Sequence, residues 1–561
     1  MLFSRKTIFI FSLIIFLIIA FQIKAANIGV SLNFYIDPSY DISGRSQLNA
    51  TLIKTTPKLY FFIEKNWWDS QSSIRQSEVL NKLDFLSQEF ENKIYPNLTS
   101  AFGSEWKPGI DGDEKITILV HQMKEEAGGY FRTADEYLKI QFPESNEREM
   151  VYLNANQIDN PQLKALLAHE FLHLITFNQK EKIQGVTEET WLNEARAEYT
   201  STFLGYEDPY ESSNLQRRAK VFLEEPTDSI TEWQNKKADY GSINLFTQYL
   251  VDHYSVSILI DSLKSKKTGI ESLNGALLKN GFKEDFSQIF TDWMITVLVN
   301  DCSLGQKYCY LNRNLKDLRI IPTVNFLPLT GKSTLSVTDI TKNWSGNWQK
   351  FIGGKGVLKF EFSSLAGLNF KVPYLIQDKE GKYSISFLVL NKEQKGEILI
   401  PDFSSKNTSL IIIPSLQTKI SGFDGPDPTY PYTFTVSILE RTPEEEAKLI
   451  QELLAQIDYL QKEIAKVQAQ IDTILAKKGE LACQKFQRDL YFGTMNSQEV
   501  RCLQEFLKSQ GPEIYPEGLV TGNFLSLTVS AVKRYQASKG IIQTGYFGPL
   551  TRAAVNQALG R

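Results

Sequence analysis

The chain has 561 residues, 42% of them hydrophobic and 22% charged, with a formal net charge of −4 at neutral pH. This length allows three or more domains, and the composition is that of a folded globular protein rather than a disordered chain. The slightly acidic balance gives no basis for nucleic-acid binding.

Residues 1–26 are predicted to be an export signal. Two basic residues precede an apolar run from Ile8 to Phe21, and Ala25 and Ala26 follow it. A charged start, an apolar core and small residues at the end are the parts of a secretory signal peptide. The run is shorter than the roughly 20 residues of a membrane-spanning helix. Cleavage is therefore favoured over retention as an anchor, and we expect a secreted or cell-envelope-associated protein.

Residues 27–315 are expected to form an α+β domain. Apolar strands are predicted at Thr56–Ile63, Lys115–Val120 and Glu149–Leu153, and an amphipathic helix at Ser77–Ile94. The third strand ends shortly before the segment that carries the most informative motif of the chain.

That motif is the HExxH pattern formed by His169, Glu170 and His173 in an apolar run that predicts a buried helix. The i, i+4 spacing places both imidazoles on one helical face, where they can bind one metal ion. Glu170 lies on the adjacent face and can take a proton from a water molecule at that metal. The alternative is an ordinary core helix with two histidines that hydrogen-bond to carbonyl groups.

A catalytic zinc ion needs three protein ligands and one open coordination position. Glu194 can supply the third ligand from a second predicted helix, which runs from Trp191 to about Phe203. Glu198 lies one helical turn further along the same face and can accept a hydrogen bond from a histidine N–H.

The sequences HEFLHLI, which starts at His169, and WLNEARAEY, which contains Glu194, resemble the gluzincin metallopeptidases. They are most similar to the hyicolysin family of secreted bacterial neutral proteases, over roughly residues 110–260. By that resemblance, His169, His173 and Glu194 would bind Zn²⁺. Glu170 would be the general base, and Glu198 would support a zinc ligand from outside. The resemblance implies a gluzincin-like α+β fold and zinc-dependent hydrolysis of peptide bonds.

The resemblance also suggests residues that contact substrate. In gluzincins the strand before the zinc helix is a sheet edge that pairs with the substrate backbone, which would place residues Tyr152 to Ala155 along the cleft. An internal core strand is the alternative. Gluzincins also use a Tyr or His to donate a hydrogen bond to the oxyanion. Tyr240, at the start of an apolar-periodic helix, is the candidate, with His253 second and His121 third; an ordinary packing role is the alternative.

The four cysteines form two local pairs, Cys302 with Cys309 and Cys483 with Cys502. An even number of cysteines in an exported chain predicts two disulfides, with four reduced buried thiols as the alternative. Neither pair has the CxxC spacing of a second zinc site.

Residues 320–440 are predicted to form an all-β, sandwich-like domain. Short runs of β-branched and aromatic residues alternate there with Gly, Pro, Asp and Asn. The expected strands are Gly356–Phe362, Tyr383–Leu390, Glu397–Ile400, Ser409–Ile413 and Tyr432–Leu439.

Residues 443–478 are predicted to form a coiled-coil helix, because apolar residues recur at two positions of four successive heptads. Isoleucine in one seam and mainly leucine in the other favour a parallel homodimer, and a stalk helix within one chain is the alternative. The first seam consists of Ile450, Ile457, Ile464 and Ile471, and the second of Leu453, Leu460, Val467 and Ile474.

Residues 480–561 contain three short predicted helices, at Glu499–Leu507, Leu527–Tyr535 and Leu550–Leu559. Two Thr-Gly units at matching positions, Thr521-Gly522 and Thr544-Gly545, make the segment internally repetitive. The segment resembles a three-helix peptidoglycan-binding domain, which implies peptidoglycan as a partner; a similar fold that binds another ligand is the alternative.

Together these patterns predict an exported zinc endopeptidase that acts on protein or peptide substrates and is tethered to the cell wall. No Gly-x-Met-Glu-Asn motif of the aminopeptidase type precedes the zinc helix, so nothing is expected to recognise a free N-terminus. The alternatives are a hydrolase of peptidoglycan cross-links and a non-catalytic wall-bound scaffold.

Overall fold

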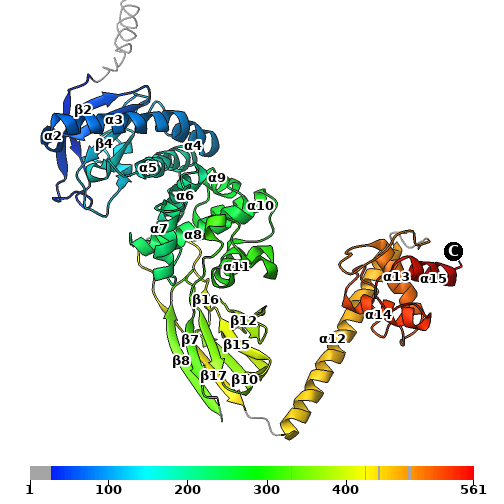
Figure 1. The fold of residues 1–561 in the computed structure, drawn as a ribbon. Helices are drawn as coiled ribbons and strands as arrows, with labels where there is room; N and C mark the ends of the chain where they lie inside the picture. The colour runs from blue at the N-terminus through cyan, green and yellow to red at the C-terminus, as the bar shows by residue number, and fades with distance from the viewer. Residues whose placement is uncertain are drawn as a thin grey trace, which may run out of the picture. The chain divides into compact units, whose positions relative to one another are not determined.

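The computed structural model describes residues 27–329, 332–423, 425–439, 443–477, 483 and 485–560. The predicted export signal lies outside these residues. The chain divides into two compact units, Met1–Glu440 and Arg441–Arg561 (Figure 1). Among the described residues, no helix combines the length and the apolar character that a transmembrane span requires.

A six-stranded mixed sheet forms the N-terminal part of the first unit (Figure 1). Its central strands β3, β4 and β6 run parallel, and β5 pairs antiparallel with β6. The strands lie in the order β1 (Ser31–Tyr35), β2 (Gln47–Thr55), β3 (Leu59–Glu64), β4 (Ile116–His121), β6 (Met150–Asn154) and β5 (Gly129–Phe131).

Alternating side chains of the central strands enter two separate cores, as strand geometry requires. Phe61 and Val151 pack into the core on the helical side, whereas Phe62 and Tyr152 pack into the core on the other face. The helices of this N-terminal part are α2 (Lys65–Asp69), α3 (Ser73–Glu89), the π-helix η1 (Phe90–Ile94), α4 (Tyr95–Phe102) and α5 (Leu163–Phe177). Helix α5 continues as the π-helix η4 (Asn178–Gln184).

The expectation that Tyr152 to Ala155 line the cleft is wrong. Strand β6 lies between β4 and β5, and Tyr152 and Leu153 are fully buried. The reason is that the chain folds back before β6 and adds β5 outside it. Strand β5 therefore forms the edge of this sheet next to the HExxH helix.

Six further helices follow α5 in the first unit (Figure 1). The helix predicted to open at Tyr240 begins three residues earlier, at Lys237, so Tyr240 lies within its first turns. A disulfide between Cys302 and Cys309 follows the last of them, as predicted. The helices are α6 (Thr190–Phe203), α7 (Asn214–Glu224), α8 (Lys237–Tyr254), α9 (Ser257–Leu263), α10 (Gly269–Lys279) and α11 (Phe286–Val299).

The β-rich segment forms two groups of strands that are joined through the single residue pair Phe403–Asn407. Phe351 of one group contacts Phe434 of the other edge to face, with ring centroids 5.4 Å apart, so the groups share a core. One group is β8 (Ser333–Thr341), β17 (Tyr430–Leu439), β10 (Gly356–Ser364) and β14 (Lys395–Phe403). The other is β13 (Tyr383–Phe387), β12 (Pro373–Asp378), β15 (Asn407–Ile412), β9 (Gln349–Gly353) and β7 (Thr323–Leu327), and β11 (Phe370–Lys371) pairs with β16 (Ser415–Leu416).

The segment between β8 and β9 packs directly on the helices of the first unit. The Trp344 ring lies 4.8 Å from Phe286 of α11, and Trp348 Nε1 donates a hydrogen bond to the carbonyl oxygen of Met294 at 3.0 Å. Both tryptophans belong to the same hydrophobic core as the HExxH helix. The packing is therefore continuous across the boundary expected near residue 320.

In the second unit, residues Pro443–Lys477 form helix α12. Ile450, Ile457 and Leu460 of the predicted heptad seams are 57%, 50% and 57% exposed. The helix occurs where the heptads predicted it, and its pairing with a second copy stays a prediction.

The remainder of the second unit consists of α13 (Gln498–Ser509), α14 (Ser526–Ser538) and α15 (Pro549–Ala558). The internal repeat has a structural cause. Buried Gln504 accepts the N–H of Gly522 and donates to Thr528, and buried Gln536 accepts the N–H of Gly545 and donates to Thr551. Each glutamine thus ties a Thr-Gly turn to the next helix. The predicted disulfide between Cys483 and Cys502 is also present.

Candidate active site

Helix α5 places His169 and His173 on the side of the helix that faces a cleft. All of its residues are buried except Lys164, Leu166 and His169. A helix with an apolar surface nearly all round is stable only in a protein interior. The two histidines are therefore held in a rigid, desolvated position.

The structure brings Glu194 of α6 to both imidazoles. Glu194 Oε2 lies 3.2 Å from His169 Nε2, and Glu194 Oε1 lies 3.5 Å from His173 Nε2. Zinc bonds of about 2.0–2.1 Å in a tetrahedral arrangement separate neighbouring ligand atoms by about 3.3 Å. Both distances from the Glu194 carboxylate to the imidazoles are thus close to those between protein ligands of one zinc ion.

The surroundings of the Glu194 carboxylate also fit a cation. Its Oε2 atom is buried and forms no hydrogen bond among the described residues. Nitrogen and carboxylate donors in this number are those of a catalytic zinc site. Glu170 also lies near, since ligand atoms of His169, Glu170 and His173 fall within 4.8 Å of one another. Glu194 is the better candidate for a third ligand, because its carboxylate reaches both imidazoles at close range.

Each histidine has a partner for its outer nitrogen. His169 Nδ1 lies 3.5 Å from Glu198 Oε1, and His173 Nδ1 lies 3.1 Å from Asn193 Oδ1. Such partners fix the tautomer and orientation of a metal-binding imidazole. Glu198 was expected from the sequence. Asn193 was not, although it directly precedes Glu194 in the WLNEARAEY segment, and that position was the available signal.

Glu198 is itself held by residues of α7 and α8. Arg218 forms two hydrogen bonds to its carboxylate, at 2.6 and 2.8 Å, and Asn214 and Asn244 donate two more, at 3.0 and 3.2 Å. Burial opposes ionisation of Glu198, but the Arg218 guanidinium lowers its pKa to about 2. Glu198 is therefore a fixed negative charge beside His169.

The charges of the site favour a cation. Burial opposes a positive charge on His169, yet the carboxylates of Glu194, Glu170 and Glu198 raise its pKa to about 9. Burial raises the pKa of Glu170 to about 8. Burial lowers the pKa of His173. Positive charge at the imidazoles thus offsets the acidic groups, and a divalent cation is suited to supply it.

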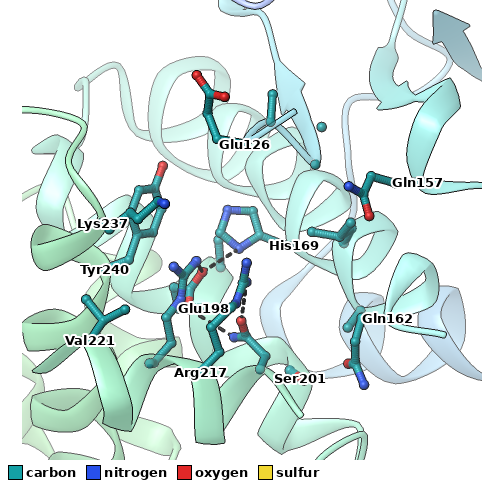
Figure 2. Close-up of a pocket in the computed structure, with 18 of the residues that line it drawn as sticks. Glu126, Gln157, Gln162, His169, Glu198, Ser201, Arg217, Val221, Lys237 and Tyr240 are labelled. Carbon is teal, nitrogen blue, oxygen red and sulfur yellow. Dashed lines mark hydrogen bonds and ion pairs between the residues drawn. The ribbon is translucent and has the colours of Figure 1, made fainter. Parts of the chain in front are cut away.

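The site lies where two arms of a cleft meet. The larger arm, of about 900 Å³, runs along α6, α7 and the start of α8, and the smaller, of about 270 Å³, runs along α5, η4 and the start of α6. Figure 2 shows His169 in the larger arm, between Glu126 on one side and Glu198 and Arg217 on the other. His169, Glu170 and Tyr240 line both arms. The cleft therefore continues on both sides of the site.

Two tyrosines border the meeting point of the arms. Tyr240 lies over Arg218, 4.4 Å from guanidinium to ring centre, and its hydroxyl donates to Asn235 at 3.2 Å. Tyr40, which no sequence signal identified, also lines both arms and stacks on Tyr130 at 4.6 Å. Burial raises the pKa of each phenol. Both phenols are thus neutral near pH 7 and able to donate a hydrogen bond.

The other two histidines lie elsewhere. His253 Nε2 lies 2.9 Å from the carbonyl oxygen of Cys309, and His121 is fully buried near Tyr130, with its Nε2 3.3 Å from that hydroxyl. Neither lines an arm of the cleft. The second and third candidates for the oxyanion donor are therefore not supported by their positions.

Comparison with known proteins agrees with both functional segments. Residues 496–555 match the family model described as "Putative peptidoglycan binding domain". Over 211 residues the chain is 28% identical to the neutral metalloprotease ShpI of Staphylococcus hyicus, a match that covers 33% of this chain and 44% of that protein. The chain thus spans less than half the length of this relative. The resemblance to a neutral metalloprotease with an added peptidoglycan-binding domain is confirmed.

Two of the similar solved structures each cover about a fifth of the chain. A periplasmic lysozyme inhibitor, PliG of Aeromonas hydrophila, is 8% identical with a TM-score of 0.15, and the match covers 21% of this chain and all of that one. The pre-peptidase C-terminal domain of a Bacillus anthracis collagenase is 9% identical with a TM-score of 0.14, covering 21% of this chain and 96% of that one. Matches at this level support no conclusion about function.

Proposed function

We propose that this protein is an exported zinc-dependent endopeptidase that its C-terminal domain tethers to the cell wall. The observation that carries the proposal is the convergence of His169, His173 and Glu194 at tetrahedral ligand spacing, in a cleft that continues on both sides. A cleft that continues on both sides of the site accommodates the middle of a peptide chain, which favours an endopeptidase.

His169, His173 and Glu194 are the residues that would hold zinc. When bound there, the ion supplies Lewis acidity, which polarises a peptide carbonyl and acidifies a water molecule. Asn193 and Glu198 orient the two imidazoles through their outer nitrogens. The distances of 3.1 Å from Asn193 to His173 and 3.5 Å from Glu198 to His169 support these two roles.

Glu170 is proposed to move the proton. Its carboxylate takes a proton from the attacking water and returns it to the nitrogen of the leaving amine. Burial makes this carboxylate more basic than an exposed glutamate, which suits a general base near neutral pH. Tyr240 is proposed to donate a hydrogen bond to the oxygen on which negative charge develops.

Strand β5 is proposed to align the substrate backbone. Its outer edge is free in the six-stranded sheet as described, and an extended peptide can add there as a further strand. Gly129 allows this approach to α5. A side chain at that position would meet the Tyr152 carbonyl oxygen at 2.5 Å and lie 3.4 Å from Glu170 Cγ. The edge strand thus passes directly beside the proposed base.

A second candidate is hydrolysis of peptidoglycan cross-links, and the match at residues 496–555 favours it. In that case the C-terminal domain would deliver the catalyst to its substrate rather than only retain it at the wall. A non-catalytic scaffold is the third candidate, and the intact set of His169, Glu170, His173 and Glu194 argues against it.

The test is to incubate the secreted form, loaded with zinc, with casein and separately with purified sacculi. We expect cleavage of casein, about one zinc per chain, and loss of activity on chelation. Glu194→Ala should lose the metal, whereas Glu170→Gln should keep it and lose turnover. Cleavage of sacculi alone would favour the second candidate, and an inert zinc-loaded protein in both assays would refute the enzymatic function.

A further inference from the structure

The larger arm of the cleft has a wall built from α7 and the start of α8. Residues Asn214, Arg217, Arg218 and Val221 of α7 line it, at the i, i+3, i+4 and i+7 positions of one helical face. Gly241 brings α8 close, since a Cβ at that position would lie 2.9 Å from the Phe222 backbone nitrogen. Close packing of the two helices places both sets of side chains on one wall.

Five basic residues of α7 and the start of α8 line the larger arm: Arg217, Arg218, Lys220, Lys236 and Lys237. Arg218 is neutralised by Glu198 at 2.6 Å. Arg217 has no carboxylate within ion-pair distance among the described residues, and its guanidinium donates instead to the neutral Asn214 Oδ1 at 2.7 Å. Lys237 likewise forms no ion pair within the part of the chain that the structure describes. Arg217 and Lys237 therefore contribute positive charge that the protein does not offset locally.

The rest of the cleft differs in this respect. In the smaller arm, Lys180 pairs with Glu188 at 3.2 Å, and Glu181 accepts a hydrogen bond from Tyr137. Across the larger arm, Glu125 and Glu126 line the opposite side, as Figure 2 shows for Glu126 relative to His169, Arg217 and Lys237. Lys124 on that side precedes both glutamates in the sequence and donates a hydrogen bond to the Ser39 carbonyl oxygen at 2.6 Å. The basic residues of the larger arm are thus concentrated on the α7–α8 wall, whose one carboxylate besides Glu198 at this arm is Glu224.

We propose that Arg217 and Lys237 form a subsite for a carboxylate of the substrate, so that the protein prefers peptides with an acidic residue in the larger arm. This inference rests on the proposed endopeptidase function and names its substrate class. Arg217 presents a planar donor group that can bind a carboxylate through two hydrogen bonds. Lys237, on the neighbouring helix, adds a second charge to the same anion. The carboxylate belongs to a peptide, whether in a protein or in the wall.

The test uses binding to the Glu170→Gln protein, so that it does not depend on turnover. Fluorescent peptides that are identical except for Glu or Gln at one position are titrated against this protein. In successive peptide pairs, that position is moved through the three residues on each side of the central peptide bond. We expect the Glu peptide to bind roughly five- to tenfold more tightly at one or more positions on one side only. Adding Arg217→Gln and Lys237→Gln should abolish the difference. Arg313→Gln, which removes an 80% exposed cation that does not line the cleft, should preserve it.

Equal binding of Glu and Gln peptides at every position would overturn the inference, and so would a preference that survives in the Arg217→Gln, Lys237→Gln protein. Arg217→Lys should retain part of the preference if charge is the cause. Failure of the zinc-loaded wild type to cleave any substrate would refute the proposed function, while the binding titration would still decide the subsite. Sacculi and casein as competitors of the bound peptide distinguish a wall source of the carboxylate from a protein source.

Discussion

The Glu189 carboxylate links the start of α6 to the β-rich segment by accepting a hydrogen bond from the backbone N–H of Gly422 at 3.0 Å. Its other oxygen accepts a hydrogen bond from Trp191 Nε1 at 2.6 Å. Since α6 carries Glu194, the β-rich segment contacts the candidate metal-binding helix at its first turn. The loop between β16 and β17 therefore helps to position the site.

Replacing Glu189 with Ala should destabilise this contact. The change removes the acceptor of the buried Trp191 indole N–H, which costs about 1–3 kcal/mol, whereas the N–H of exposed Gly422 can bond to water instead. Urea unfolding monitored by tryptophan fluorescence measures the loss. Glu271→Ala, which removes a 56% exposed carboxylate on α10, is the matched control and should change stability little. Equal effects of the two changes would contradict the role of Glu189.

Asn193→Ala should weaken metal binding. The change removes the oxygen that faces His173 Nδ1, and loss of such an outer partner typically costs 10- to 100-fold in affinity. Competition with a chromogenic chelator measures the affinity. Asn193→Asp retains an acceptor oxygen at this position and should restore much of it. Unchanged affinity in Asn193→Ala would show that the imidazole is oriented by its packing alone.

Tyr240→Phe should lower kcat without changing the zinc content. Loss of one oxyanion donor costs about 10²–10³-fold in other hydrolases, and the ring over Arg218 is retained in the variant. Tyr40→Phe keeps the stacking on Tyr130 and is the comparison. We expect it to have the smaller effect on kcat. The reverse order would assign the donor role to Tyr40.

The stability of the fold should depend on pH through two buried acids, Glu136 and Glu149, in the segment between β5 and β6. Burial raises the pKa of Glu149 from 4.5 to about 7, and burial together with the Glu149 carboxylate raises that of Glu136 well above its usual value. Both Glu136 oxygens are buried without a hydrogen bond among the described residues. The folded state thus retains protons that the unfolded state releases. The stability contributed by the pair is fully present below about pH 4.5 and is lost as the pH rises through about 7.

Glu149→Gln tests this dependence. The amide oxygen can still accept the hydrogen bond from the Ile110 N–H, but it carries no charge. We expect the melting temperature of the variant to rise relative to that of the wild type as the pH increases from 4.5 to 7. A difference that stays constant over this range would contradict the proposed protonation of the pair.

Helix α12 should mediate formation of a dimer. Ile457 and Ile464 are 50% and 46% exposed, and burial of such a seam in a parallel pair is the main source of coiled-coil stability. Sedimentation equilibrium of the exported chain should give a dimer, and Ile457→Lys combined with Ile464→Lys should give a monomer. Lys462→Gln changes a 70% exposed side chain outside the seam and should leave the dimer intact. A monomer in the wild type would support the stalk helix.

Local sequence determined the parts of this protein whose signals repeat along one element. The HExxH spacing fixed both imidazoles on one face of α5, and the heptads marked α12 nearly to its ends. The two cysteine pairs are close in sequence, and both form the disulfides expected of them. Helix periodicity acts over three or four residues, so such features can be recognised without knowledge of the fold.

Tertiary structure alone decided which distant segments meet. The position of β5 outside β6, the entry of Tyr40 into the cleft and the contact of Glu189 with Gly422 each join elements that no local pattern relates. The same holds for the uncompensated charge of Arg217, which depends on Glu198 already being paired with Arg218. Strand order and helix packing are set by burial of apolar surface over the whole unit, and a single side chain carries no signal of that outcome.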